Sequence, residues 1–192
     1  MVQAAFQALR VVVDDLLSVM PPRCLRALLH CVAAFAGQTA DVNASLTAIG
    51  LLWAVGDFAL TQCGGDGGGE AEAAAAAAAD FEELEQQGVS SPDQASLAAV
   101  AAAATASAAE AEAAAAAARR EGESGVPRTR VWAALAWWLR ALAVDARSEV
   151  RTCALQTLAS AVVSHGRGLR GAEWRVCLAR CLLPTLEQVR PP

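Results

Sequence analysis

The sequence predicts an all-α fold of HEAT- or armadillo-like helical repeats, that is, an α-solenoid fragment, with a long Ala/Gly-rich low-complexity insertion. Apolar residues recur at helical spacing in two stretches, and no stretch shows the period-two alternation of a strand. The third observation is a short turn followed by a new apolar helix in residues 145–158, which is typical of a repeat hinge. We expect a helical piece of about three helices in residues 1–63, the insertion in 64–127, and a HEAT-like repeat piece of about three helices in 128–192.

Three helices are expected in the first piece. The first spans 3–19, places its large apolar residues on one face, and ends at Pro21 and Pro22. The second spans 23–36 and has the same amphipathic pattern. The third begins near Asp41, and its apolar residues suit an antiparallel hairpin with the second.

The middle stretch is different in composition. Residues 64–127 are mostly Ala, Gly, Glu and Ser, so we expect them to contribute nothing to a core. Residues 70–87 include Phe81 and Leu84 and could form a short helix, and Ser91 has the surroundings of a second helix start. Because the stretch lacks an apolar face, we interpret it as a disordered or isolated-helix insertion between repeats.

Three further helices are expected in the last piece. They span 129–144, 148–164 and 171–189, with a Gly-containing break at 165–168. Pro184 should kink or divide the last of these helices, since proline lacks an N–H and clashes with the preceding turn.

The turn after the fourth helix is the predicted repeat hinge. Apolar residues recur every four positions along the helix that follows it. Arg151 lies beside this stripe, where we expect its guanidinium to reach a carboxylate such as that of Asp145. The residues of the hinge are Asp145, Arg147, Val150, Arg151, Ala154 and Leu158.

Charge and cysteine usage exclude several classes of protein. The net charge is −5, the basic residues are all Arg, and they are scattered, which gives nucleic-acid binding little support. Five of the six cysteines fall in apolar helical patterns, as expected of a reduced, cytoplasmic chain. Charged residues interrupt the N-terminal apolar run, so no signal peptide is expected. The longest apolar run, 46–56, stops at Asp57, short of the ~20 residues that span a membrane.

No residue pattern favours an enzyme. His30 adjoins Cys31, but neighbouring helix positions point roughly 100° apart, so they form no dyad. His165 is expected at a helix C-terminus as a structural cap. Cys177 and Cys181 share a helix face but lack further metal ligands at the usual spacing. We therefore expect no catalytic, cofactor-binding or metal-binding residues and no cofactor.

Two adjacent tryptophans have different expected environments. Trp138 fits the apolar stripe of its helix, whereas Trp137 points away from it. We expect Trp137 either to be exposed at an interface or, as we favour, to pack on a neighbouring repeat that this chain lacks.

Two stretches resemble one family. Residues 40–58 are similar to a segment of the MON-two family in which a polar–apolar run ending in Trp is followed by an Asp. The matching residues are Asn43, Ser45, Leu46, Thr47, Ala48, Ile49, Gly50, Leu51, Leu52, Trp53 and Asp57. The hinge, together with Trp174 and the run around Pro184, resembles later repeats of this family and the C-terminal repeats of the related large Arf guanine-nucleotide exchange factors.

The resemblance implies a non-enzymatic scaffold for Golgi–endosome vesicle trafficking that acts through protein–protein interaction. It implies a cytoplasmic location, peripheral to Golgi and endosome membranes, and protein partners such as Dopey-family proteins and Arf-like small GTPases. Family members are much longer, so we expect this chain to be a fragment. Two alternatives stay open: the regulatory repeats of a large Arf exchange factor, and a generic HEAT-repeat adaptor. The unbroken run 46–53 favours the MON-two family.

Overall fold

The computed structural model describes residues 2–62 and 128–189 and, between them, residues 75, 77–79, 81–82 and 84–85. This part of the chain is helical, with no strand. Its elements are α1 (Val2–Leu16), the 3-10 turn η1 (Leu17–Val19), α2 (Pro22–Gly37), α3 (Val42–Gln62), α7 (Arg128–Leu142), α8 (Ser148–His165), the 3-10 turn η2 (Gly166–Gly168), α9 (Gly171–Cys177), the π-helical turn η3 (Leu178–Leu182) and α10 (Leu183–Val189).

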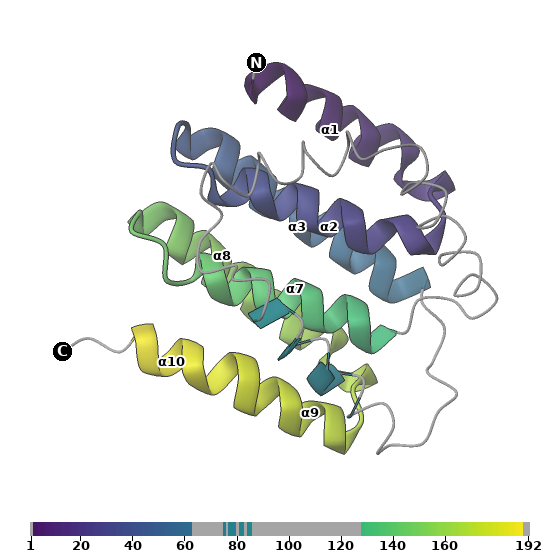
Figure 1. Cartoon of the computed structure of the whole chain (residues 1–192), viewed down its shortest axis with the longest axis vertical. Coiled ribbons are helices and arrows are strands. Elements are labelled where there is room, and N and C mark those ends of the chain that lie inside the picture. The colour runs from purple at the N-terminus through teal and green to yellow at the C-terminus, as the bar shows by residue number, and fades with distance from the viewer. Residues whose placement is uncertain are drawn as a thin grey trace.

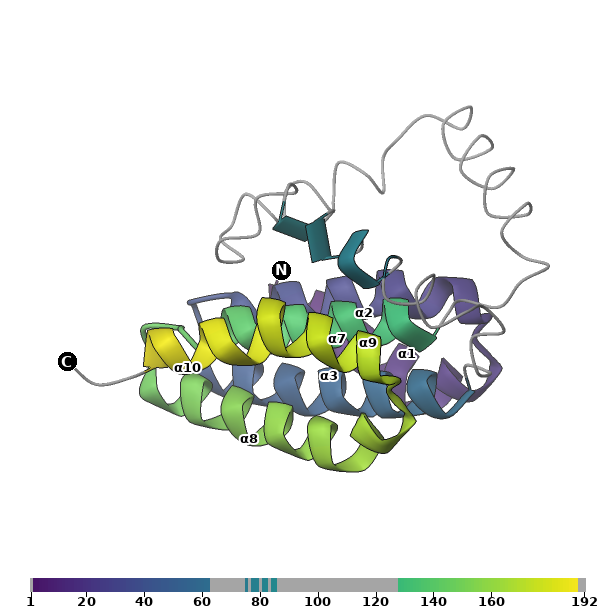
Figure 2. The same ribbon diagram turned by 90° about the horizontal axis from the view of Figure 1, so that it is seen from below.

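The helices follow one another across the molecule in chain order, from α1 at one end to α9 and α10 at the other (Figure 1). Two pairs of long helices, α2 with α3 and α7 with α8, are antiparallel and joined by short turns. Figure 2 shows two layers, with α2, α7 and α9–α10 in one and α3 and α8 in the other. The predicted all-α class is thereby confirmed for the described residues.

Helix α3 lies at the centre and contacts α2, α7, α8 and α1. Of the described helices it alone is long and apolar enough to cross a membrane, but 44% of its most apolar window is buried inside the protein. A helix that is apolar on several sides is also what a packed core requires. The finding is therefore weak evidence for a membrane span.

One continuous apolar core includes residues from both sides of the middle stretch. Helix α7 is the most deeply placed element, since every side chain in residues 131–139 is buried. The core also includes Phe81 and Leu84, which are 1% and 0% exposed. The expectation that residues 64–127 bury nothing is therefore wrong at these two positions, because two large apolar side chains three residues apart form a small apolar helix face. The helix expected from Ser91 lies outside the described residues.

Pro184 divides the last helix, as predicted, and the structure shows how. A five-residue π-helical turn, η3, separates α9 from α10. Proline at position 184 has no N–H to give to the carbonyl of Arg180, four residues earlier. The guanidinium of Arg140 on α7 donates to that carbonyl instead, at 2.8 Å. The backbone irregularity is thus satisfied by a side chain from a neighbouring helix.

Candidate functional site

The side chain of Gln38 organises the turn between α2 and α3. Its Oε1 accepts hydrogen bonds from the main-chain N–H groups of Ala40 (2.7 Å) and Asp41 (2.9 Å). Its Nε2 donates to the Asp41 carbonyl and to the Ser45 hydroxyl, the latter at 2.9 Å. Asp41 in turn caps α3, since its Oδ1 accepts from the N–H of Asn43 at 2.9 Å. The buried Gln38 side chain therefore supplies hydrogen bonds that main-chain groups would supply in a longer loop.

Arg147 lies in the turn between α7 and α8 and connects it to the turn between α2 and α3. Its Nε and Nη2 donate to the two carboxylate oxygens of Asp145, both at 2.9 Å. Its Nη1 donates to the Gln38 carbonyl at 2.8 Å and to the Ser45 hydroxyl at 3.0 Å. We call Gln38, Asp41, Ser45, Asp145 and Arg147 the turn network. It joins the two helical hairpins at their turns.

The predicted contact of Arg151 with the Asp145 carboxylate is wrong. Arg151 donates to the main-chain carbonyls of Asp145 (2.9 Å) and Ala146 (2.8 Å). Arg147 takes the carboxylate because its own N–H already bonds Asp145 Oδ1 at 2.8 Å, which places its side chain alongside. The three apolar hinge residues are buried in the core, namely Val150, Ala154 and Leu158.

The Asp145–Arg147 pair is ionised. Burial raises the pKa of Asp145, but the hydrogen bonds and charge of Arg147, with the charge of Arg151, outweigh it and hold this pKa below its ordinary value of 3.8. The hydrogen bonds that the Arg147 guanidinium donates to the Asp145 carboxylate likewise raise the pKa of Arg147. The Asp145–Arg147 pair is bidentate and partly buried, and it is therefore stronger than an exposed ion pair.

A second contact joins α3 and α8 toward their C-terminal ends, away from the turn network. The buried His165 ring lies 2.8 Å, Nε2 to Oδ1, from Asp57. The ring of Trp53 lies 5.8 Å from the same imidazole. His165 is in the last turn of α8, where it was expected, but its side chain connects two helices. The sequence signal for this contact is the spacing of Trp53 and Asp57, which are four residues apart and therefore lie on one face of α3.

The residues of the family run divide between core and surface. Ser45 and Ile49 are buried, and Leu46, Trp53 and Asp57 are half-buried. The exposed members are Asn43, Thr47 and Gly50. The run thus combines core packing, the turn network and one face of the surface.

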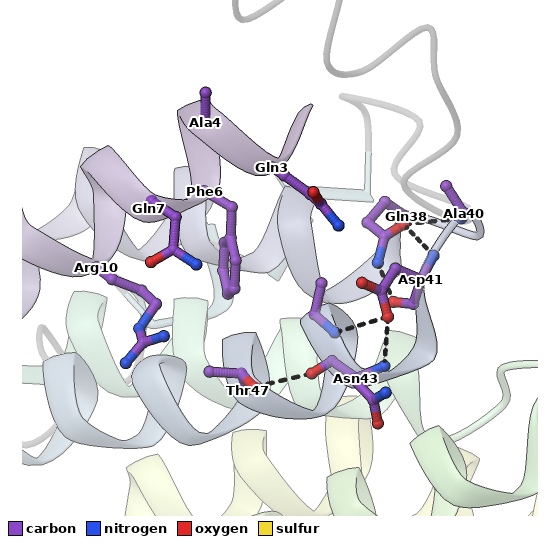
Figure 3. Close-up of a pocket in the computed structure, with 11 residues that line it drawn as sticks. Gln3, Ala4, Phe6, Gln7, Arg10, Gln38, Ala40, Asp41, Asn43 and Thr47 are labelled. Carbon is purple, nitrogen blue, oxygen red and sulfur yellow. Dashed lines mark hydrogen bonds between the residues drawn. The ribbon is translucent and has the colours of Figure 1, made fainter. Parts of the chain in front are cut away.

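That surface includes an open groove of about 510 Å³ between α1 and the start of α3. Figure 3 shows Gln7 and Arg10 of α1 on one side and Asn43 and Thr47 of α3 on the other. Phe6 lies beneath, where its ring packs 5.2 Å from that of Phe35. The Thr47 hydroxyl donates to the Asn43 carbonyl at 2.8 Å. A polar lining over an apolar floor suits contact with another protein.

The cysteines are poor candidates for chemistry. Burial raises the pKa of Cys177, and it raises that of Cys181 to about 12, so both thiols are protonated at neutral pH. All cysteines in the described part are free, and Cys24, expected in an apolar face, is exposed.

Within the described part of the chain no three His, Cys, Asp or Glu side chains lie together as a metal site. His30 packs edge-on against Trp138, at 5.5 Å between ring centroids.

The two adjacent tryptophans of α7 are buried, Trp137 at 8% and Trp138 at 4% exposure. The expectation that Trp137 is exposed or awaits an absent repeat is wrong. The ring of Phe81 meets its ring edge-on at 6.3 Å, and the guanidinium of Arg140 lies 5.1 Å from its centroid. The middle stretch therefore supplies the cover that we had assigned to a missing neighbour.

Charged residues surround this contact. Arg180 pairs with Glu82 at 3.2 Å and with Glu85 at 3.3 Å, and Arg140 lies 3.9 Å from Glu85. We call Trp137, Arg140 and Arg180 the Trp137 surface. It is an aromatic anchor beside two arginines, a combination common in binding sites.

Comparison with known proteins identifies the family. The family described as the C-terminal region of Mon2 protein matches residues 14–192. The chain belongs to this Mon2 family. It is 29% identical over 191 residues to Protein MON2 homolog of Drosophila melanogaster, covering 99% of this chain and 9% of that protein. The human Protein MON2 homolog is 29% identical over 190 residues, with the same coverage. Monensin-resistant homolog 2 of Caenorhabditis elegans is 25% identical over 190 residues, covering 99% of this chain and 8% of that protein.

The resemblance to the MON-two family is thereby confirmed. The chain spans about 9% of the length of the Mon2 relatives named first. No solved structure matches it.

Proposed function

We propose that this chain is a segment of a non-enzymatic scaffold for vesicle-mediated transport between Golgi and endosomes. The observation that carries the proposal is the Mon2 family match across residues 14–192. That match also favours this role over the regulatory repeats of an Arf exchange factor and over a generic adaptor.

The arrangement of the helices supports a solenoid of HEAT or armadillo type. Successive hairpins stack in chain order in two layers, and the turn network connects one hairpin to the next. Stacked helical pairs of this kind present long surfaces to partners, since each pair contacts only its neighbours. The chain would act by holding other proteins in place.

Protein partners are proposed on the same basis. Dopey-family proteins and Arf-like small GTPases fit the scaffold role, and a cytoplasmic location peripheral to Golgi and endosome membranes follows from it. The groove between α1 and α3 is the surface that we assign to a protein contact, because Arg10 and Thr47 place polar groups above Phe6.

Binding of purified partners to the whole chain tests the proposal. We expect a purified Dopey-family protein to bind, and Arg10→Glu in the groove to weaken binding about tenfold, which is ~1.4 kcal/mol. Arg175→Glu is the matched control, since Arg175 is exposed on α9 and lies outside the groove. Failure of both a Dopey-family protein and an Arf-like GTPase to bind would overturn the partner proposal. Faster nucleotide exchange on an Arf GTPase in the presence of the chain would contradict the non-enzymatic role.

A further inference from the structure

We propose that the Trp137 surface is a docking site for a short acidic amphipathic helix, and that Phe81, Glu82, Leu84 and Glu85 occupy it as an internal ligand. The inference names one surface of the proposed scaffold and the chemistry of its partner, and in that sense it rests on the proposed function.

The apolar half of the contact resembles a helix bound in a groove. Phe81 and Leu84 lie three residues apart, on one face of a helix, and both are fully buried. Phe81 packs edge-on against Trp137. Anchoring by two apolar side chains at this spacing is how amphipathic helices dock on other proteins.

The charged half of the contact determines that the ligand carries negative charge. Glu82 and Glu85 are also three residues apart, and Arg180 pairs with both of them. These carboxylates are 56% and 39% exposed, so each pair adds little affinity and mainly selects an acidic partner. The surface therefore fits a helix whose residues follow the order apolar, acidic, any residue, apolar, acidic.

Two of the three groups of the docking surface are held by parts of the chain other than the occupant. Trp137 belongs to α7, and Arg140 is held by its bond to the Arg180 carbonyl, to which Pro184 has no N–H to donate. Arg140 in turn lies over Trp137. Because these contacts hold Trp137 and Arg140, removing the occupant leaves the site preorganised at these two groups.

The occupant is connected to the rest of the chain by sequence of low complexity. Gly-rich residues 64–69 precede it and Ala-rich residues 95–118 follow it. Because the ligand belongs to the same chain as the site, its binding is intramolecular, with an effective concentration in the ~mM range. It therefore fills the site by default, and a stronger external helix can displace it.

The test uses the full chain and a fluorescein-labelled peptide with the sequence of residues 74–90. In the vacated variant, Phe81→Ser with Leu84→Ser, we expect the peptide to bind at least about tenfold more tightly than to the wild-type chain. Adding Arg180→Glu to the vacated variant should abolish that gain. A peptide carrying Glu82→Arg and Glu85→Arg should restore tight binding to the vacated variant that also carries Arg180→Glu.

Two results would overturn the inference. One is a vacated variant that melts cooperatively but does not bind the peptide. The other is loss of cooperative melting in that variant, which would make Phe81 and Leu84 ordinary core residues. An independent test of the charges uses a full chain with only Glu82→Arg and Glu85→Arg, which keeps the apolar contact. This variant should bind the wild-type peptide more tightly than the wild-type chain does, and equal binding would also count against the site.

The outcome is separable from the trafficking proposal. Peptide binding together with no binding of Dopey-family or Arf-like proteins would overturn the partners but leave this site. Partner binding without peptide binding would overturn this site alone.

Discussion

Arg147 donates a hydrogen bond of 3.0 Å to the hydroxyl of Ser45, although 102 residues separate them in the chain. Ser45 belongs to the family run in α3, and Arg147 belongs to the hinge between α7 and α8. The two sequence motifs that carried the resemblance therefore meet at one contact. The Ser45 hydroxyl accepts this bond and donates to the Gln38 carbonyl at 3.0 Å, so it satisfies groups from both turns.

Replacing Arg147 by Met should lower the free energy of unfolding by about 2–3 kcal/mol, since it removes the guanidinium that donates to the partly buried Asp145 carboxylate and to the Gln38 carbonyl. Chemical denaturation of the whole chain measures this loss. Arg175→Met removes an exposed arginine instead and should change stability by less than about 0.5 kcal/mol. Equal effects of the two substitutions would show that the turn network adds no stability.

The stability contributed by Asp145 should depend on pH. Because its pKa is lower in the folded chain than the ordinary 3.8, the ionised form stabilises the fold above pH 3.8. This contribution is lost as the pH falls through the folded pKa. The difference in unfolding free energy between wild type and Asp145→Asn should therefore be constant from pH 7 to about pH 5 and shrink below about pH 4. A difference that grows on acidification would contradict the assignment.

Two glycines of α3 should respond to alanine in opposite directions. A Cβ on Gly50 meets nothing within 4 Å, so Gly50→Ala should stabilise the helix by about 0.5–1 kcal/mol. A Cβ on Gly56 would lie 2.7 Å from Cδ2 of Leu135, a fully buried side chain that would have to shift. Gly56→Ala should therefore cost about 1–3 kcal/mol through overpacking. Thermal melting of both variants gives the signs, and stabilisation by both would contradict the close approach of α3 and α7.

Arg140 and Pro184 should be coupled energetically. Arg140→Met should cost about 1.5–3 kcal/mol in the wild-type chain, since it leaves the Arg180 carbonyl without its charged donor. In a Pro184→Ala background the main-chain N–H of residue 184 becomes available to the same carbonyl, so the cost should be smaller. A double-mutant cycle measures the difference, and strict additivity would show that the proline and the arginine act separately.

The sequence pattern predicted the helices and not their partners. Apolar periodicity placed the first helix at 3–19, where the structure has α1 followed by η1. It also indicated that Pro184 divides the last helix. These features depend on neighbouring residues and on proline chemistry, which a single sequence contains. The HEAT or armadillo assignment and the three-piece division stay predictions.

The errors concern contacts between distant residues. Arg147 rather than Arg151 binds the Asp145 carboxylate, because Gln38 and Ser45 of another turn help to hold it. Trp137 is covered by Phe81, from a stretch whose composition indicated no core at all. Nothing local in the sequence specifies which surface lies opposite a given side chain.

The π-helical turn η3 has a consequence for chain length in the family. The buried residues Cys177, Cys181 and Thr185 recur at every fourth position, a period slightly longer than that of an α-helix. A π-helical turn holds about one residue more than an α-helical turn, which keeps this stripe facing the core. Loss of one residue from 178–182 would convert η3 into ordinary α-helix with the flanking ends still in place. Among Mon2 proteins, we therefore expect this turn to tolerate a one-residue deletion that the uninterrupted helices α3 and α7 do not.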